Sequence, residues 1–157
     1  MDDLTRLVVF TLEGHRFALP LGNVQRVFRL VEVTPLPKAP EVVLGVVNIR
    51  GRIIPVVDIR KRFRLPERRS ELSDHLIISD TSRRPVGIIA ESVEGISECP
   101  EKEVVSPGEI IPGIEYVEGV ARLKDGIVLI HDIEKFLSLE EEEILDQALA
   151  RKTRENE

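Results

Sequence analysis

The chain has 157 residues, of which 42% are hydrophobic, and a formal net charge of −6 at pH 7. That length suits one compact domain or two small lobes sharing a core, and the hydrophobic content excludes an intrinsically disordered chain. The acidic balance argues against nucleic-acid binding, which needs a basic face. The longest apolar run, residues 42–47, is far shorter than the ~20 residues of a membrane-spanning helix. We therefore expect a soluble cytoplasmic protein that neither binds nucleic acid nor inserts into a membrane.

Strand signals dominate the start of the chain. Residues 7–12 and 16–21 are β-rich runs around Glu13-Gly14-His15, and they predict a hairpin with Gly14 in its turn. Residues 22–29 fit a helical turn or a bulged strand equally well. Residues 34–40 contain three prolines, which exclude a central strand or a helix interior and predict an extended connector.

A second hairpin is predicted next, because residues 42–49 and 52–59 are apolar runs that flank Arg50-Gly51. The end of this unit, residues 58–64, predicts one helical turn. Residues 64–74 are charged and lack apolar periodicity, so we expect an exposed loop there.

The second half of the chain predicts two more hairpins and a helix. The hairpins pair residues 76–78 with 85–90 and residues 117–123 with 126–130. Residues 99–113 contain three prolines and predict another connector. Ser138 followed by Glu141 is a capping-box signature, so a C-terminal helix should begin there.

Two segments of the chain repeat each other. Residues 45–63 and 119–137 align without gaps at an offset of 74 and share Gly, Val, Ile, Asp, Ile and Lys. Two copies are too few for a solenoid, which needs at least ~3 repeats. We therefore expect a pair of similar small β-units packed on each other, with a seam between them where partners dock.

The sequence offers little catalytic chemistry. His15, His75 and His131 are far apart, and none has a second His or Cys at metal-ligand spacing. Asp58 and Asp132 are equivalent in the two repeats, and we interpret them as helix N-caps rather than as paired catalytic carboxylates. We expect no enzymatic activity, no catalytic residue, no cofactor and no metal.

Arg50 lies in a hairpin turn without a local reason to be there. Such turns favour Asn, Gly and Asp, and we can name no folding role for a long guanidinium at this position. Two interpretations remain open: an exposed turn residue, or a contact residue presented rigidly to a partner, a role in which arginine is enriched.

The same turn lies within a longer motif. Residues 33–40, VTPLPKAP, and residues 45–58, GVVNIRGRIIPVVD, resemble the signature of the CheW-like chemotaxis coupling proteins. The resemblance covers nearly the whole chain and implies an all-β fold with a C-terminal helix, built from two SH3-like five-stranded β-barrels around a shared hydrophobic core. It implies a CheW-like domain over residues 5–150 and a charged tail over residues 151–157.

The resemblance also implies a function. Members of this family are non-enzymatic adaptors that couple chemoreceptors to a CheA-type histidine kinase. The expected partners are the regulatory domain of the kinase and the cytoplasmic tip of a methyl-accepting chemoreceptor, which recruits the cytoplasmic adaptor to membrane-associated arrays. The alternative is a paralogue that serves a non-standard receptor or a non-flagellar pathway, such as pilus or gliding motility.

Position by position, the resemblance implies a receptor-binding groove. Its residues in this chain are Asn48, Arg50, Gly51, Val24, Arg26, Leu76 and Val86. Arg26 stands where many members carry an acidic residue, so we expect it to alter partner choice, because charge complementarity acts mainly on specificity. Residues that contact the kinase are not assigned.

Overall fold

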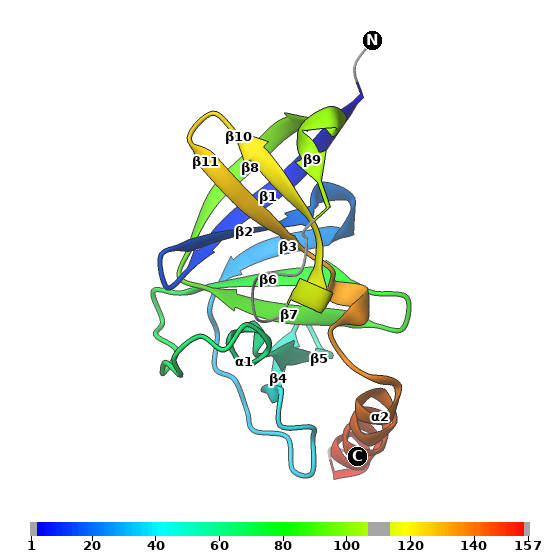
Figure 1. Cartoon of the computed structure of the whole chain (residues 1–157). Helices are drawn as coiled ribbons and strands as arrows, with labels where there is room; N and C mark the ends of the chain where they lie inside the picture. The colour runs from blue at the N-terminus through cyan, green and yellow to red at the C-terminus, as the bar shows by residue number, and fades with distance from the viewer. Residues whose placement is uncertain (1–2, 107–113, 156–157) are drawn as a thin grey trace.

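The structure is a computed structural model that describes residues 3–106 and 114–155. Two β-sheets form two lobes, drawn one above the other in Figure 1. The first lobe has the strand order β8-β1-β2-β11-β10-β9, and the second has the order β3-β6-β7-β5-β4. The sequence predicted this mostly-β architecture, and the two-residue β9 adds a sixth strand to the first sheet.

The strands of the first lobe are β1 (Leu4–Leu12), β2 (His15–Pro20), β8 (Ser92–Pro100), β9 (Val104–Val105), β10 (Val117–Leu123) and β11 (Gly126–His131). Those of the second lobe are β3 (Val24–Arg29), β4 (Val43–Ile49), β5 (Arg52–Val57), β6 (His75–Asp80) and β7 (Pro85–Ala90). The α-helices are α1 (Ile59–Arg62) and α2 (Leu139–Glu155). Short 3₁₀ turns cover Leu21–Asn23, Glu101–Glu103, Ile114–Tyr116 and Ile133–Lys135.

The expected pair of similar β-units is present, and neither lobe is a contiguous half of the chain. Strand β3 leaves the first hairpin and pairs with β6, while β8 leaves the third hairpin and pairs with β1. The repeated hairpins join their sheets through parallel contacts, β5 with β7 and β11 with β2. Strand exchange therefore holds the two lobes together through the backbone.

The sequence repeat is a structural repeat. Hairpins β4–β5 and β10–β11 share a bulge, at Val43/Gly45 in one and at Val117/Gly119 in the other. A helical turn follows each hairpin, and its N-cap is the aspartate that the sequence predicted. The Asp58 side chain accepts from the Arg60 N–H at 3.1 Å, and the Asp132 side chain accepts from the Glu134 N–H, also at 3.1 Å.

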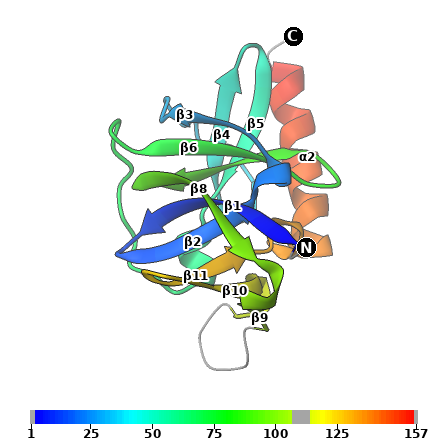
Figure 2. The same ribbon diagram turned by 90° about the horizontal axis from the view of Figure 1, so that it is seen from above.

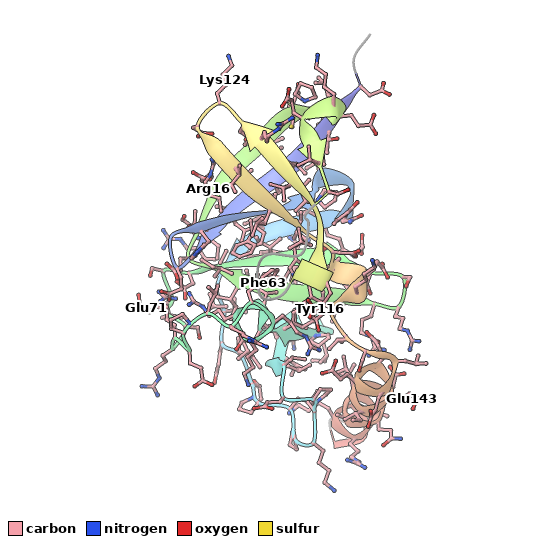
Figure 3. The ribbon with its side chains drawn as sticks, in the orientation of Figure 1. Arg16, Phe63, Glu71, Tyr116, Lys124 and Glu143 are labelled. Atoms are coloured by element: carbon pink, nitrogen blue, oxygen red, sulfur yellow. The ribbon has the colours of Figure 1, made fainter. Side chains whose placement is uncertain are left out.

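Three apolar clusters form the core. One fills the first lobe and one fills the second, whereas the largest combines residues of both sheets with α2 and lies between the lobes. Phe63, near the centre of Figure 3, belongs to this interlobe cluster, and its ring centroid is 4.9 Å from that of Phe17. Figure 2 shows α2 running alongside the β4–β5 hairpin, where it contributes Leu145 and Ala148.

Several local predictions are confirmed and one is wrong. All four hairpins are present, and residues 22–29 contain both of the open alternatives, because a 3₁₀ turn at Leu21–Asn23 leads into the bulged strand β3. The predicted connector at 99–113 is wrong at its start, because Cys99 lies buried in β8 and pairs with Thr5 of β1. Residues 107–113 of that connector lie outside the described residues.

Helix α2 begins at the predicted capping box. The Ser138 N–H donates to Glu141 Oε1 at 2.8 Å, and the Glu141 N–H donates to Ser138 Oγ at 3.1 Å. The helix continues to Glu155, through most of the segment expected to be a charged tail, and residues 156–157 lie outside the described residues.

Candidate functional site

The turn between β4 and β5 is a tight two-residue turn. Ile49 pairs with Arg52, and the two residues between them have positive φ, 53° at Arg50 and 86° at Gly51. This is the pattern of a type I′ turn, which matches the twist of the flanking strands. The Gly51 N–H donates to Asn48 Oδ1 at 2.9 Å. Asn48 and Gly51 therefore build the turn, and the turn presents Arg50 to solvent.

Arg50 occupies this turn at a conformational cost. A residue with a Cβ in the left-handed region is less stable by roughly 1–2 kcal/mol, and Asn or Gly tolerates the region better. The turn between β1 and β2 has a similar residue, Glu13, with a φ of 50°. The Glu13 carboxylate accepts a hydrogen bond from the buried Arg60, whereas the Arg50 side chain has no ion-pair or hydrogen-bond partner among the described residues.

Arg50 borders a groove of about 280 Å³ between β3 and the β4–β5 hairpin. We call it the basic groove, and its lining residues are Gln25, Arg26, Phe28, Ile49, Arg50, Arg52, Ile54 and Ile78. The three arginines are exposed, whereas Ile54 and Ile78 belong to the buried core of the second lobe. The groove therefore has an apolar floor and a cationic rim.

The structure brings together part of the predicted site. Arg26 and Arg50 line the basic groove although 24 positions separate them, because β3 and the β4–β5 hairpin belong to the same lobe. Val24 does not line it. The bulge between Val24 and Arg26 interrupts the alternation of the strand, and Val24 packs against the interlobe cluster.

Neither Leu76 nor Val86 lines the basic groove. Leu76 is 0% exposed and lies within the core of the second lobe. Val86 is 3% exposed and borders a different hollow, of about 170 Å³, beside the start of α2. Leu76 shares a face of β6 with Ile78 and packs within the core of the second lobe, whereas Val86 packs in the interlobe cluster.

Sequence reasoning missed Arg52 and the apolar floor. Arg52 directly follows the turn and pairs with Ile49, so the spacing Arg-Gly-Arg was a usable signal for a second cation at the same place. Phe28 and Ile78 come from β3 and β6, whose pairing no local pattern indicated. The floor therefore forms only because β3 pairs with β6 of the second lobe.

The remaining polar groups of interest are wholly or partly buried. His131 lies between the rings of Phe63 and Phe136, and burial lowers its pKa to about 3, so the imidazole is neutral. Burial also raises the pKa of Asp58, which serves as a helix cap. Residues 3–106 and 114–155 contain no group of three or more His, Cys, Asp or Glu side chains placed to hold a metal ion. None of their helices is long and apolar enough to cross a membrane.

Comparison with known proteins places the chain in a family. The model of the CheW-like domain matches residues 6–141. The chemotaxis protein CheW of Treponema pallidum is 31% identical over 146 residues, covering 89% of this chain and 86% of the relative. CheW of Klebsiella aerogenes is 27% identical, covering 88% and 85%. The crystal structure of the scaffolding protein TtCheW from Thermoanaerobacter tengcongensis superposes with a TM-score of 0.79 at 28% identity, covering 88% of this chain and 90% of that one. The chain belongs to the CheW-like family.

Proposed function

We propose that the basic groove is the surface through which this adaptor contacts the cytoplasmic tip of a chemoreceptor. As a CheW-like protein, the chain is a chemotaxis adaptor that couples receptors to a CheA-type histidine kinase. The observation that supports the groove is Arg50, an exposed arginine in a strained turn without a partner among the described residues. Strain that the fold does not need is characteristic of functional positions.

The groove suits a protein partner better than a small metabolite. It is open, and its polar groups are long and exposed, whereas small-molecule sites bury most of their ligand and converge several fixed polar groups on it. Signalling contacts are often small and individually weak, and an array of them gains affinity through high effective concentration. The adaptor would therefore act in the cytoplasm, recruited to receptor arrays.

The same reasoning supports a non-enzymatic role. The buried His131 is neutral and enclosed by aromatic rings, so it is not available to a substrate as a base. Asp58 and Asp132 are engaged as helix caps. The described residues form two lobes packed on a shared apolar cluster, with a cationic groove, and this arrangement suits binding rather than catalysis.

The test is a calorimetric titration of the purified chain against a receptor tip fragment and against the kinase regulatory domain from the same organism. We expect saturable binding to both. Arg50→Glu should weaken the receptor interaction about 100-fold, since buried interface arginines often contribute more than 2 kcal/mol. Arg50 is exposed and unpaired within the described residues, so the melting temperature of the Arg50→Glu variant should stay within about 3 °C of that of the wild type.

Lys124→Glu is the matched control for this titration. Lys124 occupies the equivalent position in the β10–β11 turn, at the far tip of the first lobe in Figure 3, so the control makes the same charge change on a similar hairpin. It should leave receptor affinity unchanged. Equal losses for both variants, or no receptor binding by the wild type, would contradict the proposal.

A further inference from the structure

The two lobes have hollows at equivalent positions, which we call mouths, and the side chains that line them differ in net charge. Each mouth lies between an edge or outer strand and the tip of a repeated hairpin: β3 with β4–β5 in the second lobe, and β8 with β10–β11 in the first. In the second lobe this mouth is the basic groove, whose lining contains three arginines and no carboxylate. The pseudo-symmetry makes the first lobe an internal reference for it.

The mouth of the first lobe balances its own charge. It is lined by three cations and three acids, namely Arg16, Arg122, Lys124, Glu98, Glu103 and Asp125. Arg16 Nη1 lies 3.0 Å from Asp125 Oδ1, and Arg122 Nε lies 3.3 Å from Glu103 Oε2. Acidic side chains therefore offset the cations within this mouth.

The basic groove has no such compensation. Arg26, Arg50 and Arg52 have neither an ion pair nor a side-chain hydrogen bond among the described residues, although the whole chain carries a net charge of −6. Guanidinium groups around one hollow repel each other, and their planar donors match carboxylate oxygens. A carboxylate placed between them would relieve that repulsion and gain charge-assisted hydrogen bonds.

Resting on the proposed function, we propose that the basic groove receives an acidic side chain of the receptor tip, with a neighbouring apolar side chain of the receptor on the floor. Phe28, Ile54 and Ile78 supply that floor, so the ligand must combine a carboxylate with an apolar body. This combination distinguishes an acidic protein segment from a polyphosphate or a nucleic acid, and the net charge of −6 would repel a long polyanion.

The consequence is partner selection by charge. A receptor with a Glu or Asp at the contact position would bind, and one with Lys or Arg there would be rejected, because like charges across an interface cost several kcal/mol. Arg26 has a decisive part in this selection, since it comes from β3, whereas Arg50 and Arg52 come from the β4–β5 hairpin on the other side of the groove.

The experiment is a charge exchange between the full chain and a receptor tip fragment of the same organism. Each Asp and Glu of the tip is replaced singly by Lys, and each fragment is titrated against the wild type, Arg26→Glu and Lys124→Glu. One Lys-substituted tip should bind the wild-type chain at least about tenfold more weakly than the native tip does. The same tip should bind the Arg26→Glu chain with an affinity within about threefold of that of the native pair. Lys124→Glu should not restore it.

The outcomes separate the two proposals. A native tip that binds, with no acidic position whose replacement is rescued by Arg26→Glu, would overturn the acidic contact and leave the adaptor function intact. The acidic contact would also be overturned if affinity for the native tip does not fall between 50 and 300 mM salt, since exposed charge pairs are screened. Failure of every native tip to bind would overturn the proposed function itself.

Discussion

Arg62 and Phe136 occupy the same position in the two repeats, and Arg62 Nε donates a hydrogen bond of 3.1 Å to the carbonyl oxygen of Phe136, 74 residues away. The Arg62 guanidinium also lies over the Phe136 and Tyr116 rings, with its Cζ 5.2 and 5.1 Å from their centroids, and pairs with Glu141. One side chain therefore ties the helical turn of the first repeat to the equivalent turn of the second and to the start of α2.

We expect Arg62→Ala to lower the free energy of unfolding by about 2 kcal/mol, because it removes a charge-assisted hydrogen bond and two cation–π contacts from a partly buried place. Urea unfolding measures this loss. Lys135→Ala is the control, because the Lys135 side chain is 71% exposed and its Nζ makes a long contact of 3.9 Å with Asp132 Oδ2. This substitution should lower the free energy of unfolding by less than about 0.5 kcal/mol. Similar losses for both variants would show that Arg62 is not a link between the repeats.

The equivalent glycines Gly45 and Gly119 should respond differently to a methyl group. A Cβ at Gly45 would lie 2.3 Å from the Thr34 carbonyl oxygen, which the Val46 N–H holds in place at 2.8 Å. A Cβ at Gly119 would lie 2.9 Å from Val104 Cγ1, a side-chain atom that can move. We expect Gly45→Ala to cost about 3 kcal/mol or more in urea unfolding and Gly119→Ala about 1 kcal/mol. Equal costs would contradict the close backbone approach at Gly45.

Local patterns predicted the hairpins because each hairpin consists of two β-rich runs joined by a short turn that adjacent residues specify. The four turns, the two aspartate caps and the capping box at Ser138 all depend on neighbouring residues, whereas local patterns left residues 22–29 open between a helical turn and a bulged strand. Strand β8 was missed for the opposite reason. Its more buried positions are Val93, Gly95, Ser97 and Cys99, so a strong apolar alternation is absent and pairing with β1 determines the strand.

The candidate site was only half predictable for a related reason. Arg50 could be identified because its residue type conflicts with its turn, and a conflict of this kind is visible in sequence. The basic groove around it could not, because its wall comes from β3, a strand that joins the lobe of β4 and β5 only through exchange. That Leu76 and Val86 lie outside the basic groove could not be predicted either, since the direction of a side chain depends on register, which pairing sets.

The buried His131 should make stability depend on pH. Its pKa is about 3 in the folded protein and ~6.5 in an unfolded chain, so below pH ~6.5 the unfolded state binds one more proton. The free energy of unfolding should therefore fall by about 1.4 kcal/mol per pH unit as pH decreases from ~6.5 toward 3. Burial alone would raise the pKa of Asp74, but Arg68 and the Glu71 N–H outweigh it and lower that pKa, so the Asp74 contribution is lost only below pH ~4.

Urea unfolding between pH 7.5 and 5.5 isolates the histidine. Neither ring nitrogen of His131 has a hydrogen-bond partner among the described residues, so His131→Leu should keep or raise stability at pH 7.5 and should flatten the dependence between the two pH values. A slope that persists in the variant would assign the effect to other groups.

Arg50→Asn should stabilise the protein while abolishing its receptor contact. Asparagine tolerates the left-handed region, so the change should relieve about 1 kcal/mol of strain at a φ of 53°, and the Asn48 bond to the Gly51 N–H that holds the turn does not involve the replaced side chain. Urea unfolding and titration of the receptor tip measure the two effects.

Glu13→Asn is the control, since Glu13 occupies an equivalent turn with a φ of 50°. Its carboxylate binds Arg60, whose side chain is 9% exposed, and the loss of that partner leaves the buried cation with Glu91 and the Pro66 carbonyl oxygen. Glu13→Asn should therefore destabilise the protein despite the same backbone relief, because removing one partner of a buried ion pair costs more than the strain. Destabilisation by Arg50→Asn as well would mean that the Arg50 side chain stabilises the fold. A stable Arg50→Asn variant without receptor binding would mean that the turn gives up stability in order to present its guanidinium.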